Sequence, residues 1–391
     1  MATLNRRHFL EFGAAGLALA TTRPSSRAIA AARPRSAPDE DDRLVRLSGD
    51  GLGLSPAQYA NLLPQLVEMN GFTPDSYSLG GVVEQLEERF AAVLGKERAI
   101  FMPTGTLANH MAVRALARGS SRVIVQQESH LYKDEGDCAQ TLSNLTLIPL
   151  APGRATFTAL DFKAALDDSK SERVLSPISV VSIETPVRRR VGERFDRAAM
   201  TEITALARAE GIRLHLDGAR LFLEAAYTGD TVADIARPFD TVYVSLYKYF
   251  NATSGAILAG PRDLLDGMYH GRRMFGGGLA SVWPFAIVAL HYLDGFDARF
   301  RRAVATAEDW IRQLGRHDAF AVERITPGTN WFRLRVKGTD PAAFRRRLAS
   351  AGVMLSAPPP EQDQFLIAVN ETWNRTTAAE LTDRFVSALA G

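Results

Sequence analysis

One lysine of the sequence stands at the end of a strongly apolar segment. Lys248 follows the alternating residues Val242, Val244 and Leu246, whose spacing is typical of a strand, and it is one of six lysines among 391 residues. A lysine at such a position is unfavourable unless its ammonium group is paired or used covalently. Because desolvation lowers the pKa of a lysine, its amine becomes a nucleophile towards aldehydes. We therefore predict a covalent role for Lys248; the alternative is an edge lysine whose head group reaches solvent.

A carboxylate and a guanidinium follow the preceding strand. Leu214 and Leu216 alternate with polar residues, so Asp217 falls where this strand should end, and Arg220 comes three residues later. In an open α/β sheet, ligands bind at the carboxyl ends of the strands. A carboxylate there can accept a hydrogen bond from a pyridinium N–H, and the arginine can hold a carboxylate with two parallel hydrogen bonds. The alternative is a structural Asp–Arg pair at a strand end.

A third segment is suited to binding phosphate. Thr104, Gly105 and Thr106 follow an apolar run and open a stretch with helical spacing. The first N–H groups of a helix and its dipole attract anions, two hydroxyls can donate hydrogen bonds, and glycine lets an anion approach the backbone. The sequence has neither the lysine-containing P-loop nor a GxGxxG motif here. The alternative is a threonine that caps an ordinary helix.

The apolar pattern indicates which elements position these residues. Helical spacing occurs at 106–117 and 195–210, and strand-like runs lie at 99–102, 122–125, 145–150, 180–183, 212–216, 242–246 and 256–259. This alternation predicts an α/β fold with a mostly parallel sheet covered on both faces. After about residue 296, a helix at 303–314 precedes strands at 331–336 and 364–369. We therefore expect a linker over 31–42, a large domain with an N-terminal arm over 43–296, and a smaller α+β C-terminal domain over 297–391.

The N-terminus has the features of an export signal over residues 1–30. Arg6 and Arg7 precede the apolar run 12–20, and the small residues 28–30 resemble a cleavage site. The apolar run is too short to span a bilayer, so no stable membrane anchor is expected. The paired arginines resemble a twin-arginine signal, so we expect the twin-arginine machinery to export the protein to the periplasm or the extracellular space. The alternative is a disordered basic tail on a cytoplasmic protein.

Composition excludes several classes of protein. The formal net charge is +2, which gives no reason to expect a nucleic-acid partner. Cys138 is the single cysteine, so an internal disulfide is excluded, and its helix-like context indicates a structural role. The seven histidines show neither HExxH nor another paired spacing, so no metal site is expected.

Four motifs, in this order, resemble those of the fold-type-I enzymes that use pyridoxal 5'-phosphate (PLP). The motifs are TGTLAN at 104–109, LHLDGAR at 214–220, SLYK at 245–248 and RRMFGGG at 272–278. The similarity is greatest to the low-specificity L-threonine aldolase branch of the β-eliminating lyase superfamily, and it covers about residues 47–293. It implies the PLP-transferase-like fold of aspartate aminotransferase, with PLP as cofactor and an amino acid as substrate.

The resemblance assigns roles to the three segments described first. Lys248 would hold PLP as a Schiff base, and Asp217 would pair with its pyridine nitrogen. Thr104, Gly105 and Thr106 would bind its phosphate.

Further roles follow from neighbouring family positions. His130 would stack on the PLP ring and act as a base, with Glu135 as an acid nearby. Arg220 would contact both cofactor and substrate, and Ser48, in a motif with one inserted residue, would touch the substrate carboxylate. Arg272 would reach phosphate across the interface of a homodimer or homotetramer; the alternative is an exposed arginine at a helix end.

The implied reaction is cleavage of a β-hydroxy-α-amino acid, threonine-like or aromatic, to glycine and an aldehyde by a PLP-dependent lyase. One alternative is a PLP-dependent β-eliminating lyase or racemase that acts on another amino acid. A different class is a protein that binds PLP or an amino acid but has lost turnover.

Three departures from the family concern the substrate. The segment 184–187 lacks an expected histidine, and the segment 364–370 lacks the family's second carboxylate-binding arginine. Bulky groups stand near the lysine and glycine motifs, at Tyr247, Tyr249, Phe250 and Trp283. We therefore expect a preference for large or aromatic side chains over threonine.

Overall fold

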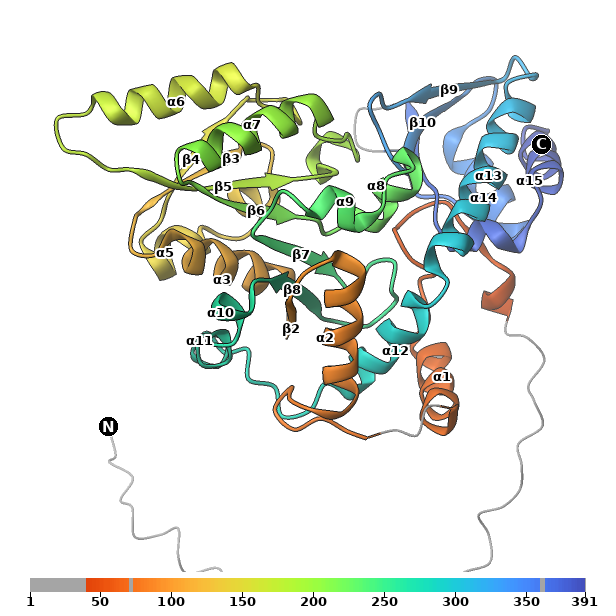
Figure 1. The fold of residues 1–391 in the computed structure, drawn as a ribbon. Helices are drawn as coiled ribbons and strands as arrows, with labels where there is room; N and C mark the ends of the chain where they lie inside the picture. Colours follow the sequence, from red (N-terminus) through yellow and green to blue (C-terminus); the bar gives the residue numbers. More distant parts are fainter. Residues whose placement is uncertain (1–39, 70–72, 359–362, 391) are drawn as a thin grey trace, which may run out of the picture. The chain divides into compact units, whose positions relative to one another are not determined.

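The computed structural model describes residues 40–69, 73–358 and 363–390 (Figure 1). The predicted export signal at 1–30 and the predicted linker up to residue 39 lie outside the described residues, so both stay predictions. From Glu40 onwards the chain forms one unit, and the predicted division near residue 296 also stays a prediction. None of the helices in the described ranges combines the length and the apolar character needed to span a membrane.

A seven-stranded sheet forms the centre of the fold, in the order β2-β8-β7-β6-β5-β3-β4. Its strands are β2 (Arg98–Met102), β3 (Arg122–Gln126), β4 (Thr146–Leu150), β5 (Ile178–Glu184), β6 (Arg213–Asp217), β7 (Thr241–Ser245) and β8 (Ala256–Gly260). From β7 to β4 neighbouring strands are parallel, whereas β8 runs antiparallel to both β7 and β2. The predicted α/β fold with a mostly parallel sheet is therefore confirmed.

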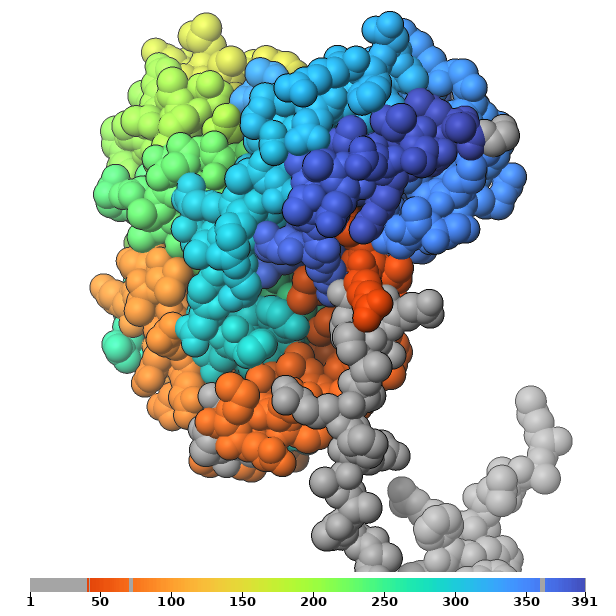
Figure 2. Space-filling model, turned by 90° about the vertical axis from the view of Figure 1, so that its right-hand side faces the viewer, coloured from red at the N-terminus to blue at the C-terminus, as the bar shows by residue number. Residues whose placement is uncertain are grey.

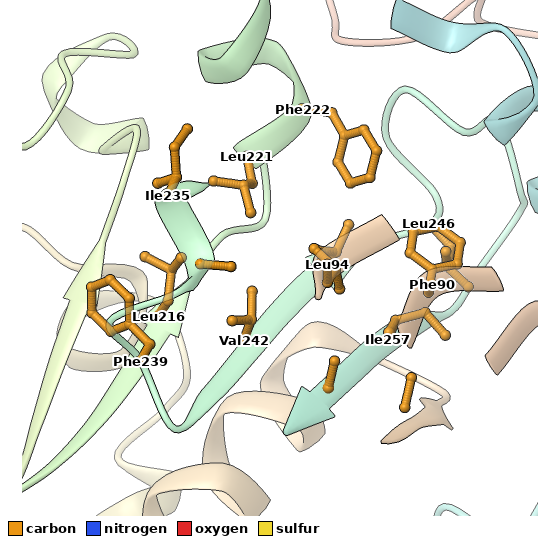
Figure 3. Close-up of a cluster of buried hydrophobic side chains, with 14 of the residues drawn as sticks. Phe90, Leu94, Leu216, Leu221, Phe222, Ile235, Phe239, Val242, Leu246 and Ile257 are labelled. Carbon is orange, nitrogen blue, oxygen red and sulfur yellow. The ribbon is translucent and has the colours of Figure 1, made fainter. Parts of the chain in front are cut away.

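Helices cover both faces of this sheet, because its strands carry apolar residues on both sides. Val242 and Val244 of β7 belong to the main core, to which α2 (Gly81–Leu94) contributes Phe90 and Leu94 (Figure 3). Tyr243, between them, faces the other side and packs with residues of α3 (Gly105–Ala117). In Figure 1, α6 (Ala159–Ser171) and α7 (Arg197–Ala209) lie on one side of β3 to β6, and α3 lies on the other.

Shorter elements join these layers. The helices are α1 (Pro56–Met69), α4 (His130–Lys133), α5 (Cys138–Ser143), α8 (Leu221–Thr228), α9 (Val232–Ala236), α10 (Arg262–Leu265), α11 (Met268–Met274) and α12 (Trp283–Leu293). Two 3-10 turns, η2 (Glu40–Arg43) and η3 (Arg188–Arg190), stand at the start of the described chain and after β5.

The C-terminal residues build a second core around an antiparallel sheet in the order β12-β10-β9. Trp310 of the long helix α13 packs edge-on against Trp373 and Phe385, with ring centroids 5.4 and 4.9 Å away. Its elements are α13 (Phe296–Leu314), β9 (Phe320–Arg324), β10 (Trp331–Val336), α14 (Pro341–Ser350), β11 (Val353–Met354), β12 (Gln364–Ala368), η4 (Glu371–Arg375) and α15 (Ala378–Ser387). The helix that we expected at 303–314 begins earlier, because Phe296 and Phe300 continue its buried face.

The N-terminal arm belongs to this second core. Its strand β1 (Val45–Arg46) pairs in parallel with β11, and Val45 is fully buried there. The side-chain amide of Asn370 donates to the carbonyl oxygens of Arg46, Ser48 and Gly49, at 3.0, 3.3 and 3.2 Å. Figure 2 shows the first described residues, in red, against the C-terminal residues, in blue. This anchoring fixes the point from which residues 48–53 run into the cavity described next.

Candidate active site

A cavity of about 610 Å³ opens at the carboxyl ends of β5, β6 and β7. The residues that line it and could take part in chemistry are Ser48, Asp50, His130, Glu184, Arg188, Asp217, Arg220, Tyr243, Tyr247 and Lys248. The cavity therefore brings together five residues that the sequence pointed to, namely Ser48, His130, Asp217, Arg220 and Lys248. The other predicted site residues, Thr104, Gly105, Thr106 and Arg272, are not among those that line it.

Lys248 lies three residues beyond the end of β7, in the wall of the cavity. Its Nζ is 3.1 Å from the Tyr247 hydroxyl and 4.4 Å from the centre of the Tyr247 ring. Burial lowers the pKa of Lys248, and the nearby Arg220 guanidinium lowers it further. Its amine is therefore more easily deprotonated than that of a solvent-exposed lysine, as nucleophilic attack requires.

A second lysine, Lys96, is also desolvated. Burial lowers the pKa of Lys96 to about 8, and its Nζ donates to the carbonyl oxygens of Ala236 and Phe239 at 3.0 and 2.6 Å. Lys96 does not line the cavity. Its hydrogen bonds give it a structural role, which distinguishes it from Lys248.

Asp217 is the buried last residue of β6, and each of its oxygens accepts a hydrogen bond. Oδ1 accepts from the Ala219 N–H at 3.1 Å, and Oδ2 accepts from the side-chain amide of Asn109 at 2.8 Å. Asn109 donates its other proton to Glu135 Oε1, also at 2.8 Å. Each Asp217 oxygen keeps a lone pair for another donor.

The orientation of Asn109 is set by a buried histidine. Asn109 Oδ1 lies 3.0 Å from His215 Nε2, and His215 Nδ1 lies 2.8 Å from the Thr241 hydroxyl. Burial lowers the pKa of His215 to about 4, so this imidazole is neutral at neutral pH. A neutral ring that donates from Nε2 and accepts at Nδ1 turns the Asn109 oxygen towards itself and the amide protons towards the carboxylates. Asn109 closes the TGTLAN motif, but sequence reasoning gave it no role.

His130 opens α4 and is held by a buried carboxylate. Its Nδ1 is 2.9 Å from Glu135 Oε1, and this hydrogen bond raises the pKa of His130. Atoms of His130, Glu135 and Asp217 that could bind a metal lie within 4.8 Å of one another. Because Asn109 donates to both carboxylates, this cluster is a hydrogen-bonded network that aligns the histidine with Asp217.

Glu184, at the end of β5, is a site residue that sequence reasoning missed. Its Oε2 accepts from the His130 backbone N–H at 2.6 Å, and its Oε1 accepts from the Arg188 backbone N–H at 2.9 Å. Burial raises the pKa of Glu184 to about 7. The segment had been noted only for its missing histidine, and an isolated acid after an apolar strand carries little signal.

The N-terminal arm adds a second missed residue, Asp50. Its Oδ2 lies 2.9 Å from Arg220 Nε and 2.8 Å from Nη2, and both side chains are nearly buried. Its other oxygen is buried without a hydrogen-bond partner. The Leu52 N–H donates to Asn251 Oδ1 at 2.7 Å, which ties the arm to the loop after Lys248.

The predicted phosphate segment begins a helix beside the cavity. Thr104 caps α3, since its hydroxyl accepts from the Leu107 N–H at 3.1 Å, as in the alternative interpretation. A Cβ at position 105 would collide with the hydroxyl of Tyr243, a residue that lines the cavity. Gly105 therefore allows this tyrosine to lie against the helix N-terminus.

Arg272 is fully buried, so the alternative of an exposed arginine at a helix end is wrong. Its guanidinium donates to the carbonyl oxygens of Phe101, Tyr77 and Ser78 at 2.6, 3.4 and 3.5 Å. Buried backbone carbonyl groups need hydrogen-bond donors, and Arg272 supplies them to Phe101, Tyr77 and Ser78. It thereby joins segments that are distant in the sequence.

The bulky residues near the lysine divide between cavity and core. Tyr247 lines the cavity and is 46% exposed. Tyr249 and Phe250 are buried and pack with Phe222, with ring centroids at 5.9 and 5.0 Å. Trp283 packs against the main core and donates its backbone N–H to Asp75. Tyr249, Phe250 and Trp283 are therefore core residues, and of the four bulky groups Tyr247 is the one that lines the cavity.

A sequence profile of the beta-eliminating lyase family matches residues 71–335. A low-specificity L-threonine aldolase of Escherichia coli is 27% identical over 73% of this chain and 84% of its own length. One of Candida albicans is 27% identical over 58% of this chain and 61% of its own length. An uncharacterised Caenorhabditis elegans protein is 28% identical, and the chain spans 58% of its length. The chain thus spans about three fifths of the last two relatives.

Solved structures share the fold. A Listeria monocytogenes protein assigned as an L-allo-threonine aldolase has a TM-score of 0.70 and 26% identity, over 90% of this chain and 97% of that chain. An Exiguobacterium protein assigned as an aromatic amino acid beta-eliminating lyase/threonine aldolase has a TM-score of 0.73 and 24% identity, over 90% and 98%. These similarities confirm the predicted fold-type-I, PLP-transferase-like architecture.

Proposed function

The chain belongs to the beta-eliminating lyase family, and from this premise we propose that it is a PLP-dependent carbon–carbon lyase. Its substrate would be a β-hydroxy-α-amino acid, and its products glycine and an aldehyde. The observation that carries the proposal is the convergence of Lys248, Asp217 and His130 on one cavity. The names of the Escherichia coli and Candida albicans relatives support this reaction.

The cavity residues fit PLP. The Lys248 amine, with its lowered pKa, matches the aldehyde of PLP. The buried Asp217 carboxylate, with free lone pairs, matches the ring nitrogen, and the imidazole of His130 matches the ring face. The N-terminus of α3, beside Tyr243, offers N–H groups to a phosphate. When bound, PLP would accept the electrons released as a bond at the substrate Cα breaks.

Residues of this chain would hold and orient the reacting groups. Lys248 would hold the cofactor through its amine, and Asp217 would keep a proton on the ring nitrogen. Asn109, whose own orientation His215 sets, helps to orient Asp217 by donating to its Oδ2, while the Ala219 N–H donates to Oδ1. Such preorganised charge stabilises a transition state without further rearrangement.

His130 would take the proton from the substrate hydroxyl. Its Nδ1 is engaged by Glu135, so Nε2 is the ring nitrogen left to accept a proton. Glu184 holds the backbone of His130, which keeps the imidazole in the cavity wall.

The test combines labelling with product analysis. After incubation with PLP, borohydride reduction and peptide mapping should place the pyridoxyl group on Lys248, with Lys96, whose pKa burial also lowers, as internal control. Incubation with threonine and with phenylserine should release glycine and an aldehyde. A label on another lysine would refute the assignment.

The alternatives predict different products. The Exiguobacterium protein's assignment and the family's name favour β-elimination as the second candidate, which would release ammonia and a keto acid. Racemisation would invert the configuration at the substrate Cα and would release neither ammonia nor a keto acid. A protein that only binds would take up PLP on Lys248 and form no product.

The proposal includes a homodimer or a dimer of dimers. An exposed apolar surface supports it, made of Tyr77, Leu79, Met274 and Leu279, which are 36% to 67% exposed. The two segments that carry these residues are adjacent, since the Tyr77 N–H donates to the Ala280 carbonyl at 2.8 Å. Sedimentation at assay concentration tests it, and a fully active monomer would rule it out.

Export through the twin-arginine machinery is part of the same proposal. Its support is the pair Arg6 and Arg7 before an apolar run. Replacing both arginines by lysine should retain the precursor in the cytoplasm, and unchanged export would contradict this.

A further inference from the structure

Three positively charged side chains line the cavity in the described part of the chain, namely Arg188, Arg220 and Lys248. The proposed function uses the Lys248 amine for the cofactor. Arg220 already has a negative partner inside the cavity wall, because Asp50 lies 2.8 Å away and the pair is 12% and 7% exposed. A substrate carboxylate at Arg220 would have to share or break this buried pair. Arg188 is the remaining cation.

The backbone of Arg188 is fixed by the same carboxylate that fixes His130. Glu184 accepts from the Arg188 N–H with one oxygen and from the His130 N–H with the other, at 2.9 and 2.6 Å. Glu184 is 4% exposed, so both hydrogen bonds are shielded from water. The backbone nitrogens of Arg188 and His130 are thereby both held by one buried carboxylate.

The turn that carries Arg188 is also anchored at its far end. The Val187 N–H donates to the Glu193 carbonyl at 2.8 Å, which closes the turn. The Gly192 carbonyl accepts from the buried Thr329 hydroxyl at 3.0 Å, so the turn is tied to the segment just before β10. Arg188 therefore projects from a turn that is held at both ends.

The guanidinium of Arg188 remains largely uncompensated. Its side chain is 53% exposed and has one contact with Asp134, at 3.3 Å. Arg189 holds the same carboxylate with two hydrogen bonds, one to each oxygen. Asp134 is thus neutralised mainly by Arg189, and the charge of Arg188 is free to attract an anion that enters the cavity.

None of the arginines of β9, β10 and β12 is among the residues that line the cavity of the candidate active site. A smaller cavity of about 200 Å³ is bounded by Arg188 and Arg220 and by Trp331 of β10 and Leu366 of β12. Arg333 shares a face of β10 with Trp331 and lies opposite Leu366, but it pairs with Glu323 and does not line this cavity. Arg335 pairs with Asp363. The strands thus present apolar side chains where the family resemblance had led us to expect a second arginine.

We propose that Arg188 binds the α-carboxylate of the amino-acid substrate, and that the turn after β5 thereby replaces an arginine of the C-terminal strands. This assignment rests on the proposed function, since it presupposes an amino acid in the cavity. Arg188 forms a charge-assisted hydrogen bond with the carboxylate, while Arg220 supports the wall through Asp50.

The test compares two ligands that differ only in the carboxylate. Glycine, the product of any such cleavage, and ethanolamine, which has CH₂OH in place of the carboxylate, are titrated calorimetrically into the PLP-loaded protein. The variants are Arg188→Gln and the matched control Arg190→Gln. Arg190 belongs to the same 3-10 turn, pairs with Glu193 and does not line the cavity.

Arg188→Gln should weaken glycine binding roughly ten- to a hundredfold, the usual effect of losing a charge-assisted hydrogen bond. Ethanolamine binding should not change, and Arg190→Gln should bind both ligands like the wild type. An unchanged preference for glycine in Arg188→Gln would overturn the assignment, as would an equal loss in Arg190→Gln. If the wild type itself binds neither ligand, the proposed function fails, and this assignment fails with it.

Discussion

Arg220 and Asp50 form a nearly buried ion pair in the cavity wall, although 170 residues separate them in the chain. Arg220 follows β6 of the central sheet, whereas Asp50 arrives on an arm that pairs with β11 near the C-terminus. The pair therefore couples the two cores at the site itself. Both partners are desolvated, so removing either one leaves a charge without compensation.

This coupling is measurable with a double-mutant cycle. Asp50→Asn or Arg220→Gln alone should destabilise the folded protein by about 3 kcal/mol, because each leaves a buried unpaired charge. The double variant should lose much less than the sum of the two, since both charges are gone. Chemical denaturation of the PLP-loaded protein provides the comparison. Strictly additive effects would show that the pair contributes nothing.

If His130 is the base, as proposed, its hydrogen bond to Glu135 should set the pH dependence of catalysis. This bond raises the pKa of His130 above its ordinary value of 6.5, so the base is protonated and inactive on the acidic side. Glu135→Gln removes the negative charge that stabilises the imidazolium. The acidic limb of kcat/KM should therefore move to lower pH, although Asp217 and Glu184 remain nearby. A pH–rate profile measures this, and an unmoved or higher inflection would argue against His130 as the base.

Strand periodicity predicted the centre of the site well. The alternation of Leu214 with Leu216 and of Val242 with Val244 located the ends of β6 and β7. Asp217 is the last residue of β6, and Lys248 lies three residues beyond β7, in the cavity wall. Parallel neighbours end at the same edge of a sheet, so two strand ends found in sequence are also close in space. The antiparallel direction of β8 could not be predicted in this way, because the alternation of apolar and polar residues along a strand is the same whichever way the strand runs.

The rest of the site depends on contacts that leave no local pattern. The strand that brings Asp50 has two residues, too few for a periodic signal. Tyr249 and Phe250 follow the end of β7, where no period tells which side faces the core. Glu184 and Asn109 act through hydrogen bonds with residues far away in sequence.

The single cysteine should be chemically inert in the folded protein. Burial, together with the nearby Glu135 carboxylate, raises the pKa of Cys138 from 9.0 to about 12. This shift lowers the thiolate fraction at pH 8 roughly a thousandfold, and the thiolate is the reactive species. Iodoacetamide should accordingly label the native protein far more slowly than the urea-unfolded protein. Comparable rates would show that the thiol is accessible and ionised.

Glu224 should destabilise the protein at alkaline pH. Burial raises its pKa from 4.5 to about 7, while the Thr185 hydroxyl donates to its Oε2 at 2.7 Å. The folded protein binds the Glu224 carboxyl proton more tightly than the unfolded chain does. The free energy of unfolding therefore decreases as the pH rises from about 4.5 through 7. Glu224→Gln keeps the acceptor without the charge, so it should add up to about 3 kcal/mol at pH 8 and almost nothing at pH 4. Equal effects at both values would contradict this.

The competition of two arginines for Asp134 gives a last test of the carboxylate site. In the wild type, Arg189 occupies both oxygens of Asp134, and Arg188 has one contact. Arg189→Gln should let Asp134 draw Arg188 away from the cavity, so glycine should bind less tightly than to the wild type but more tightly than to Arg188→Gln. Adding Asp134→Asn removes the competitor, and the double variant should regain wild-type affinity. Calorimetric titration of glycine into the PLP-loaded variants measures all four. If Arg189→Gln binds glycine like the wild type, Asp134 does not control Arg188; if the double variant stays weak, Arg189 itself contributes to the site.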